Sequence, residues 1–484
     1  MKPWFCRQLS ITYMAMLIIS SSSYYSIASE TSDEEPPSFY GNRSVTQHKP
    51  EQKTPEIRFQ RRAVAPPITI ENDIPTSAES QESKSTTENT FETKGLSLAK
   101  PVTIPLTRQE LILANKARYY IERNWNSDTG LIDSVQGYPH STMWDIASSL
   151  AALLALDALK LMPSNEASFK IEKTLSTLAN FPLYNGKLPN REYNTQTALP
   201  SGRFSKSKSN GNGWSALDIG RLLIWLHVTS KMKPQFSEQI NQIITKWDLS
   251  AAIHNKTLYG ELKTRTGRVY RQEGRLGYLQ YAATGFKLYG YNVSEAFSKN
   301  NIKQINVSNV PLLIDTRNLP FFTTDPHALS AIELHMRDSW WNQLDELYQL
   351  HHEYYKRTGK SWVFAEDAMS HSPWFSYNNI YFYGTPWLST SAGGKPIENP
   401  QVFSNKIAIS LSVLFDDEFS SMIKKQVINN SLGLRSVPTG TYDNNAPNQA
   451  FNINTNSLVL VSLWFKTRNY RSIIDVVNEH DSNS

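Results

Sequence analysis

The sequence predicts an all-α protein with the fold of an (α/α)6 barrel, with short β-hairpins in the loops that rim a cleft. Two kinds of helical segment alternate along the chain, about six of each, at a repeat of roughly 40 to 70 residues. One kind is amphipathic and charged, and the other is apolar on nearly all sides. A helix that is apolar all round is buried on all sides, and an amphipathic helix covers it from outside. The alternation therefore indicates an inner and an outer ring of helices.

The amphipathic segments are expected to form the outer ring. They run over residues 107–123, 165–180, 234–247, 339–357 and 417–429. A short, weak helix between Leu288 and Ile302 would complete this ring.

The apolar segments are expected to form the inner ring. They run over residues 145–161, 214–228, 273–288, 326–336, 402–415 and 454–465. An open helical solenoid is the alternative. The connections into the apolar helices are long and those leaving them are short, which favours a closed barrel with its functional loops at one end.

Two of the long connections have the pattern of β-hairpins. Residues 258–270 alternate in character on both sides of a Thr266-Gly267 turn, and residues 377–387 place Gly384 after an aromatic run. Both hairpins are expected to rim the mouth of the barrel.

The first 28 residues have the features of a secretory signal peptide. A charged start precedes an apolar stretch too short to span a bilayer comfortably, and Ser26-Ile27-Ala28 offers a cleavage site. An uncleaved membrane anchor is the alternative. The remaining chain divides by composition into a disordered linker, the barrel and a flexible tail, over residues 29–104, 105–470 and 471–484. We therefore expect a periplasmic or secreted protein with no stable membrane span after signal cleavage.

Composition argues against several kinds of site. The single cysteine, Cys6, lies within the predicted signal, so the mature protein would have no disulfide, thiolate nucleophile or Cys-ligated metal. The formal net charge of +5 is small and scattered, so we expect no nucleic-acid partner. Neither a glycine-rich phosphate loop nor an H-E-x-x-H motif is present, so we expect no metal and no other cofactor. The oligomeric state stays open.

The aromatic content fits a site for saccharides. Twelve Trp and 23 Tyr fit either a large core or a carbohydrate groove, because aromatic rings stack on the apolar faces of sugars. The segment from Val269 to Ala283 places several such groups at the start of an apolar helix. The candidate binding residues there are Tyr270, Arg271, Gln272, Arg275 and Tyr278, and Glu273 lies among them as a candidate catalytic carboxyl.

Two other predicted helix starts place a tryptophan near an aspartate, and an aromatic loop places a glutamate next to an aspartate. Trp144-Asp145 and Trp214 with Asp218 lie at predicted inner-helix starts, and Glu366-Asp367 follows an aromatic stretch. Trp387 is a further candidate for ligand contact. The alternative is that the carboxylates cap helices and the tryptophans wedge between helices. Asp218 lies one turn inside its helix, so capping explains it less well, although a buried partner such as Arg221 could explain it.

Five segments are similar to the bacterial domain-of-unknown-function family 3131. They are TMWDIASSLAALLAL from Thr142, GWSALDIGRLL from Gly213, VYRQEGRLGYLQYAATGF from Val269, YNNIYFYGTPW from Tyr377 and NINTNSLVLVSLWF from Asn452. The resemblance extends from about Leu106 to Thr467 and implies a glucoamylase-like (α/α)6 enzyme, a group that includes β-1,2-glucanases. Residues 388–395 contain less Gly and aromatic character than this family has there, which implies a different rim.

The predicted function is an inverting glycoside hydrolase that acts on a β-glucan or another envelope polysaccharide, with an oligo- or polysaccharide as partner. Glu273 is the expected acid and Asp145 the expected base, with Asp218, Glu366 and Asp367 as further candidates. A non-catalytic glycan-binding or polysaccharide-assembly protein is the alternative. A third possibility is a polysaccharide lyase, which would use Arg271, Arg275 and Tyr278 on a uronate.

Overall fold

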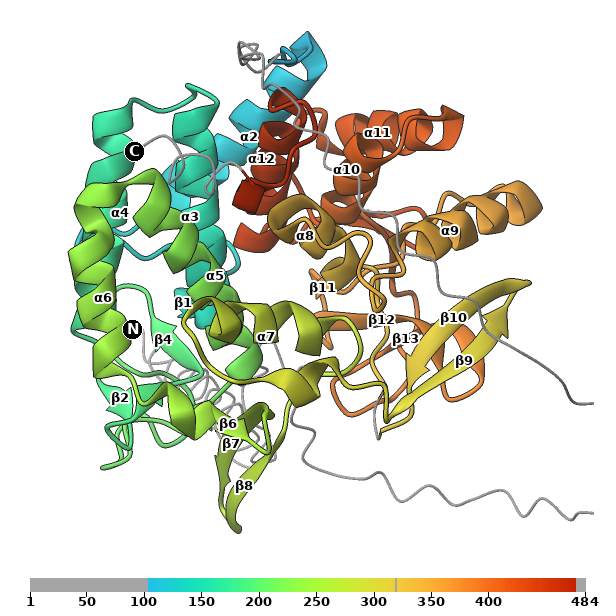
Figure 1. Ribbon diagram of the computed structural model, residues 1–484. Helices are drawn as coiled ribbons and strands as arrows, with labels where there is room; N and C mark the ends of the chain where they lie inside the picture. Colours follow the sequence, from blue (N-terminus) through green and yellow to red (C-terminus); the bar gives the residue numbers. More distant parts are fainter. Residues whose placement is uncertain (1–102, 318–319, 476–484) are drawn as a thin grey trace, which may run out of the picture.

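Six helices line the axis of the protein and pack in a closed ring (Figure 1). The computed structural model describes residues 103–317 and 320–475. The ring consists, in order, of α3 (Met143–Ala158), α5 (Ala216–Met232), α7 (Tyr278–Leu288), α8 (Asp325–Leu334), α10 (Asn405–Leu414) and α12 (Ile453–Thr467), which returns to α3. This ring confirms the predicted (α/α)6 barrel.

The outer positions are taken by one helix that precedes the first inner helix in the chain and by five that each follow an inner helix. They are α2 (Arg108–Asn124), α4 (Ser164–Ala179), α6 (Ser237–Lys246), the 3-10 helix η3 (Ser294–Phe297), α9 (Leu344–Thr358) and α11 (Glu418–Ser431). The element η3 is the short helix expected between Leu288 and Ile302.

Burial separates the two rings as the sequence pattern predicts. Every residue of α3 from Met143 to Leu156 is buried. In α9 the buried side chains instead recur at helical spacing on one face: Leu344, Leu347, Tyr348, Leu350 and His351.

Two inner helices begin three or more residues later than predicted. The α7 helix begins at Tyr278 rather than residue 273, because β8 extends to Gln272 and Gly274 and Gly277 then have φ angles of 81° and 98°. Such positive φ angles suit glycine and interrupt a right-handed helix. The α10 helix begins at Asn405 rather than residue 402, because the preceding four residues form a strand.

Both predicted hairpins are present. The first pairs β7 (Thr257–Thr264) with β8 (Gly267–Gln272), and its turn is Arg265-Thr266, one residue earlier than predicted. The second pairs β12 (Phe375–Phe382) with β13 (Thr385–Thr390). A third hairpin, β9 (Ile302–Val307) with β10 (Val310–Asp315), was not predicted.

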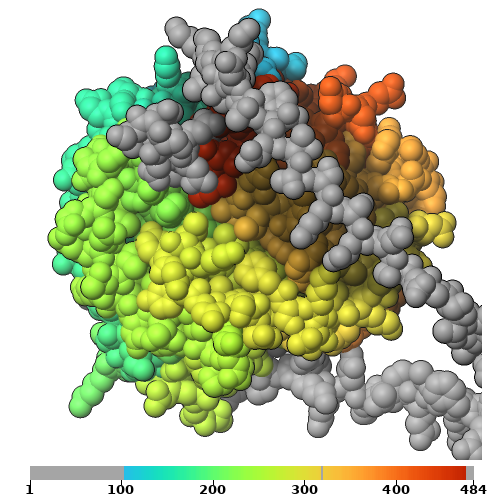
Figure 2. Space-filling view, viewed as in Figure 1, coloured from blue at the N-terminus to red at the C-terminus, as the bar shows by residue number. Residues whose placement is uncertain are grey.

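The other strands are short and also pair in antiparallel fashion. They are β1 (His140–Thr142), β2 (Leu183–Tyr184), β3 (Leu188–Pro189), β4 (Glu192–Asn194), β5 (Gly213–Trp214), β6 (Ile253–His254), β11 (Asp367–Ala368), β14 (Gln401–Ser404), β15 (Gly440–Tyr442) and β16 (Pro447–Asn448). The labelled strands gather in the lower half of Figure 1. In the same view the green and yellow part of the chain forms a continuous surface there (Figure 2).

The predicted signal peptide, nearly all of the predicted linker and residues 476–484 of the tail lie outside the described residues. Within residues 103–317 and 320–475, every helix is too short or too polar to cross a bilayer.

A buried carboxylate joins the first described helix to the last two. Glu110 of α2 is 1% exposed and accepts hydrogen bonds from Lys424 of α11 at 3.1 Å and Lys466 of α12 at 2.6 Å. Burial alone would raise the pKa of Glu110, but the bond from Lys466, the backbone N–H of Thr107 and the charge of Lys424 outweigh burial and lower it to about 2. Glu110 therefore connects helices more than 300 residues apart in the chain.

Replacing this carboxylate should destabilise the barrel in a pH-dependent way. At pH 7 we expect Glu110→Gln to lower the free energy of unfolding by about 2–4 kcal/mol, because two lysines lose their buried partner. The folded-state pKa lies below the ordinary glutamate value of 4.5, so the contribution is present above that pH and is lost as the pH falls towards 2. Urea denaturation at several pH values measures this difference.

The matched control is Glu122→Gln, on the same helix, which removes only the surface pair with Arg118 and should cost less than about 0.5 kcal/mol. Equal effects of the two substitutions at pH 7 would contradict the role given to Glu110.

Candidate active site

A small polar cavity lies where the N-terminal ends of the inner helices meet. All six helices contribute to its wall, with Trp144, Arg221, Tyr278, Asp325, Leu329, Lys406, Asn454 and Leu458. Its volume is about 20 Å³, enough for one water molecule. Most of these residues belong to the first turn of their helices, so the cavity is the floor of a site at the hairpin-bearing end of the barrel.

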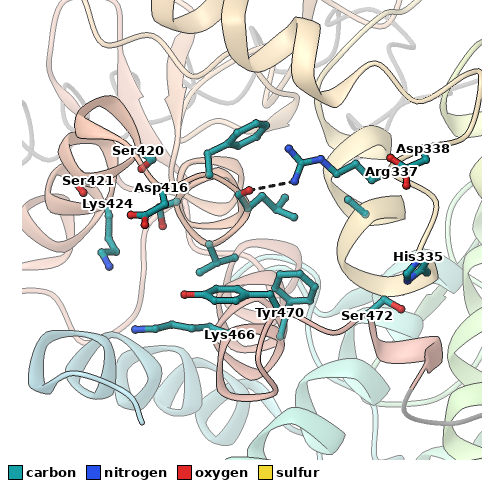
Figure 3. Close-up of a pocket in the computed structure, with 16 residues that line it drawn as sticks. His335, Arg337, Asp338, Asp416, Ser420, Ser421, Lys424, Lys466, Tyr470 and Ser472 are labelled. Carbon is teal, nitrogen blue, oxygen red and sulfur yellow. Dashed lines mark hydrogen bonds between the residues drawn. The ribbon is translucent and has the colours of Figure 1, made fainter. Parts of the chain in front are cut away.

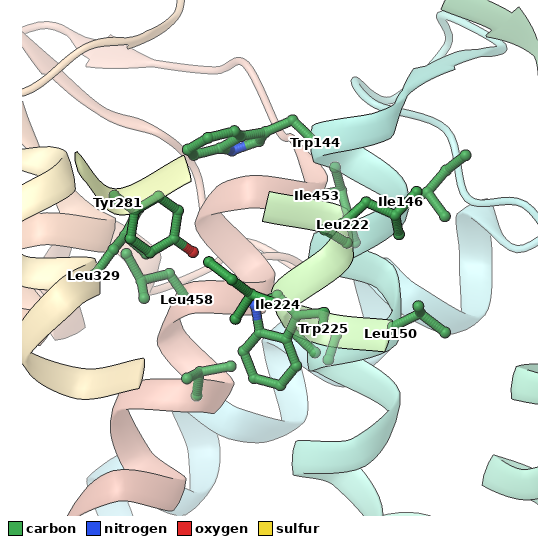
Figure 4. Packing of buried hydrophobic residues seen from close by; sticks show 14 of the residues in the cluster. Trp144, Ile146, Leu150, Leu222, Ile224, Trp225, Tyr281, Leu329, Ile453 and Leu458 are labelled. Carbon is green, nitrogen blue, oxygen red and sulfur yellow. The ribbon is translucent and has the colours of Figure 1, made fainter. Parts of the chain in front are cut away.

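The aromatic part of the wall comes from α3 and α7. The rings of Trp144 and Tyr278 meet edge to face with centroids 5.6 Å apart, and Trp144 also lies 5.9 Å from Tyr281. Figure 4 shows Trp144 and Tyr281 on the same side of the core, with Leu329 and Leu458 beside Tyr281. The guanidinium of Arg221 lies 4.6 Å from the centre of the Trp144 ring, a cation–π contact.

The polar part of the wall is organised by Lys406. Its ammonium lies 2.9 Å from Asp325 Oδ1 and 3.6 Å from Asp367 Oδ2, and it donates to the carbonyl oxygen of Glu366 at 2.6 Å. Burial alone would lower the pKa of Lys406, but the charges of Asp325, Asp367 and Glu366 outweigh burial and raise it. Burial raises the pKa of the Asp367 carboxyl despite the nearby ammonium. One cation thus pairs with two carboxylates and also holds the backbone of Glu366.

Glu366 is the member of this cluster that reaches the aromatic wall. Its Oε1 accepts a short hydrogen bond from the hydroxyl of Tyr278, and its backbone N–H donates to Asp325 Oδ2 at 3.1 Å. Asp367, by contrast, turns towards α12 and accepts from Asn452 at 2.6 Å and from Thr455 at 3.2 Å. The predicted pair is therefore present, and its two carboxylates face different partners.

Asp145 is bound at both carboxylate oxygens. Oδ2 accepts from the backbone and hydroxyl of Thr142 at 2.9 Å each, in a capping box that starts α3, and Oδ1 accepts from Asn454 at 2.9 Å. The residue therefore caps one inner helix and connects it to another, as the capping alternative predicts.

Glu273 has similar contacts. It is fully buried; its Oε1 accepts from Arg191 at 2.9 Å, and its Oε2 accepts from the backbone N–H groups of Ala216 at 2.5 Å and Leu217 at 3.4 Å. These N–H groups begin α5, where a negative charge is favourable. Gly260 leaves the room for this carboxyl, since a β-carbon there would lie 2.2 Å from it. Arg191 forms an ion pair with Glu273, and the Glu273 charge also opposes the lowering of the Arg271 pKa by burial.

Asp218 lies in the first turn of α5, three residues before the cavity-lining Arg221, and is 9% exposed. Arg221 pairs with Glu333 of α8 at 3.3 Å. Glu333 also accepts from Tyr281 at 2.5 Å and Trp225 at 3.2 Å. Burial raises the pKa of Glu333, although Arg221 opposes this shift. A buried polar network thus lies directly below the cavity.

The remaining predicted binding residues do not line this cavity. Trp214 donates to the carbonyl of Tyr259 at 3.0 Å, and the Tyr270 hydroxyl donates to the carbonyl of Ala251 at 3.0 Å. Gln272 accepts from Arg275 at 2.9 Å. Burial lowers the pKa values of Arg271 and Arg275, that of Arg275 to about 10.

Trp387 lies apart from the cavity wall. It packs against the outer helix α9, with ring centroids 5.3 Å from His351 and 4.9 Å from Tyr354.

Several residues of the site were not predicted. Lys406 is the single charge of the apolar helix α10, and Glu333 is an isolated charge near the end of α8, and that pattern was available in the sequence as a signal. Arg191 could not be identified from the sequence as a residue of the site. It lies shortly after the two-residue strand β3, and its partner Glu273 is 82 residues away in the chain. In the part of the chain that the structure describes, no group of three His, Cys, Asp or Glu side chains has the arrangement to hold a metal ion.

A family model described as "Protein of unknown function (DUF3131)" matches residues 112–469. None of the curated proteins matches the sequence.

Solved structures match at the level of the fold. A candidate glucoamylase from Bacteroides caccae is 11% identical with a TM-score of 0.56, over 77% of this chain and 97% of that chain. The endo-β-1,2-glucanase of Chitinophaga pinensis, in complex with sophorotriose and glucose, is 11% identical with a TM-score of 0.55, over 77% and 97%. The endo-β-1,2-glucanase of Talaromyces funiculosus, with sophorose, is 12% identical with a TM-score of 0.51, over 77% and 89%. These similarities support the (α/α)6 architecture.

Breaking the ion pair below the cavity should be costly. We expect Glu333→Ala to lower the free energy of unfolding by about 3–5 kcal/mol, because it leaves Arg221 buried without its carboxylate. The double variant Arg221→Met, Glu333→Leu should recover much of this loss, since it removes both charges. Chemical denaturation of the single and double variants tests this, with Glu172→Ala on the exposed face of α4 as control. A double variant that is less stable than Glu333→Ala would show that the charges do not act as a pair.

Proposed function

This chain belongs to the DUF3131 family, and from its fold and its site we propose that it is a glycoside hydrolase that cleaves a β-glucan. The observation that carries the proposal is the pairing of Glu366 with Tyr278 beside Trp144, at the N-terminal ends of the inner helices. A carboxyl group next to aromatic rings can hold a sugar and transfer a proton to its glycosidic oxygen.

Glu366 is the general acid in this proposal. Its carboxyl donates a proton to the glycosidic oxygen as the bond from that oxygen to the anomeric carbon breaks. Glu273, the acid expected from the sequence, is held by a guanidinium and the start of α5. Those contacts engage both carboxylate oxygens and suit a structural ion pair better than a proton donor.

Asp218 is the general base in this proposal. It takes a proton from the water that attacks the anomeric carbon on the face opposite the leaving group, which gives inversion. Asp218 is preferred to Asp145, because both oxygens of Asp145 are used by the capping box and by Asn454. It also projects from α5, whereas Glu366 lies beside α7 and α8, so the two carboxylates come from different walls.

Lys406 positions the acid without touching the sugar. It binds the backbone carbonyl of Glu366 and balances the charges of Asp325 and Asp367. Without that cation, three carboxylates would repel one another in a buried place.

The proposed substrate class rests on the aromatic residues of the cavity wall and on the similarity to solved structures. A sugar ring would lie above the one-water cavity, with its apolar face towards Trp144 and Tyr278. β-1,2-Glucan is the first substrate to test, because two of the similar structures are β-1,2-glucanases. The predicted signal over residues 1–28 supports action in the periplasm or outside the cell.

Glu366→Gln should abolish turnover and preserve folding. The amide keeps its bond with Tyr278 but carries no transferable proton, so turnover should fall by a factor of about 10² or more. Reducing ends released from linear β-1,2-glucan measure the effect, and proton NMR of the first product should show the inverted α-anomer. Glu353→Gln, on the outer helix α9, should retain activity. Full activity of Glu366→Gln would refute the assigned acid.

Glu273→Gln separates the two assignments of the acid. Because the amide removes the charge opposite Arg191, we expect a loss of about 2–4 kcal/mol in stability. Turnover below the melting transition should stay within a few-fold of the wild type. If the variant is fully stable and inactive, Glu273 is the acid, as the sequence suggested.

A non-catalytic glycan-binding protein is the second candidate, because the full engagement of Asp145 and Glu273 suits a rigid binding floor as well as an enzyme. Retention of β-1,2-glucan by wild-type protein that releases no reducing ends would favour it.

A further inference from the structure

A second, larger cavity lies at the opposite end of the barrel (Figure 3). Its volume is about 490 Å³, and residues at the C-terminal ends of α8, α10 and α12 line it together with the first turns of α11. Asp325 begins α8 at the candidate active site, and His335 follows the end of α8 at this cavity. The ten residues of α8 rise by about 15 Å, which separates the two places.

An exposed aromatic ring lies in this cavity. Tyr470 is 49% exposed, and its ring meets Phe465 edge to face at 6.0 Å. Asn469 and Tyr470 both have left-handed backbones, with φ angles of 55° and 59°. Such backbones are unfavourable for residues with side chains. The turn that ends α12 is therefore held in a conformation that presents the Tyr470 ring to the cavity.

Polar side chains with hydrogen-bonding capacity surround the ring. Asp338, Asp416 and Ser421 are exposed at the cavity. Lys424 and Lys466 also line it, each anchored by Glu110. Figure 3 shows Lys466 and Lys424 on one side of Tyr470 and Arg337 and Asp338 across the cavity. Donors and acceptors thus converge around one aromatic surface.

The charges disfavour an anionic ligand. Arg337 pairs with Asp345 at 2.5 Å, and both lysines share Glu110. His335 lies 2.7 Å from Asp475. Asp338 and Asp416 add negative charge and form no salt bridge within the described residues. A neutral ligand rich in hydroxyl groups fits this balance better than a phosphate or a uronate.

We propose that this cavity is a second, non-catalytic binding site for the same β-glucan, with Tyr470 as the surface on which a sugar ring stacks. The inference rests on the proposed function, since it takes the substrate of the first site as its ligand. A glucan that occupies both sites must run along the outside of the barrel. Only long chains can therefore bind at both sites and gain affinity from the second site. The site would hold polymer near the enzyme and leave short oligosaccharides unaffected.

The experiment compares Tyr470→Ala and Asp416→Ala with Phe169→Ala, which removes a ring that is 57% exposed on the outer helix α4. Binding of long linear β-1,2-glucan and of sophoropentaose is measured by calorimetry in the Glu366→Gln background, where the polymer stays intact. Circular dichroism confirms that each variant folds.

We expect Tyr470→Ala to weaken polymer binding by roughly five- to twentyfold, a factor set by loss of one of two linked contacts. Its affinity for sophoropentaose should match that of the control. With Glu366 restored, the rate on polymer at low concentration should fall, and kcat/KM on sophoropentaose should not change. Polymer affinity that is unchanged in both Tyr470→Ala and Asp416→Ala would overturn the inference.

The two proposals fail in different ways. If wild-type protein cleaves polymer and Tyr470 has no effect on binding, the second site is refuted and the hydrolase stands. If wild-type protein cleaves nothing but binds polymer through Tyr470, the hydrolase is refuted and the second site stands as a glycan-binding site.

Discussion

The candidate active site depends on one buried ammonium group. Lys406 supplies the positive charge that allows Asp325, Glu366 and Asp367 to share one end of the barrel, and it fixes the backbone of Glu366 directly. Without it, burial and mutual repulsion would favour neutral carboxyl groups and a different loop. Tyr278 then fixes the Glu366 side chain, so the position of the proposed acid follows from one cation and one hydroxyl group.

The two ends of the barrel differ because of the direction of the inner helices. At the N-terminal end, carboxylates and amides cap helices and neighbouring hairpins extend over them. At the C-terminal end, Glu110 and two lysines join the first and last helices. That end carries few strands, and a larger cavity is left there. The candidate active site and the proposed second glucan site are thus separated by the length of an inner helix.

Hydrophobic pattern was enough to predict the barrel, because helices such as α3 and α9 differ plainly in which residues are apolar. The predicted start of α7 at residue 273 was wrong: residues 273–277 contain a single apolar side chain, Leu276, and the two glycines among them have positive φ angles that exclude a helix. The β9–β10 hairpin was missed because Ile302–Asp315 has no clear turn signal beyond Ser308-Asn309. Within the site, Glu366 and Asp367 could be identified because they are adjacent carboxylates in the sequence. Ion pairs between distant residues, such as Arg191 with Glu273, depend on the finished fold.

A crystal structure of the Glu366→Gln variant with a β-1,2-gluco-oligosaccharide tests the central claim most directly. The account predicts a glycosidic oxygen within about 3 Å of the residue-366 side chain, a sugar face against Trp144 and Tyr278, and Asp218 across the gap. An oligosaccharide whose glycosidic oxygen lies beside Glu273 instead, with residue 366 out of reach, would contradict it.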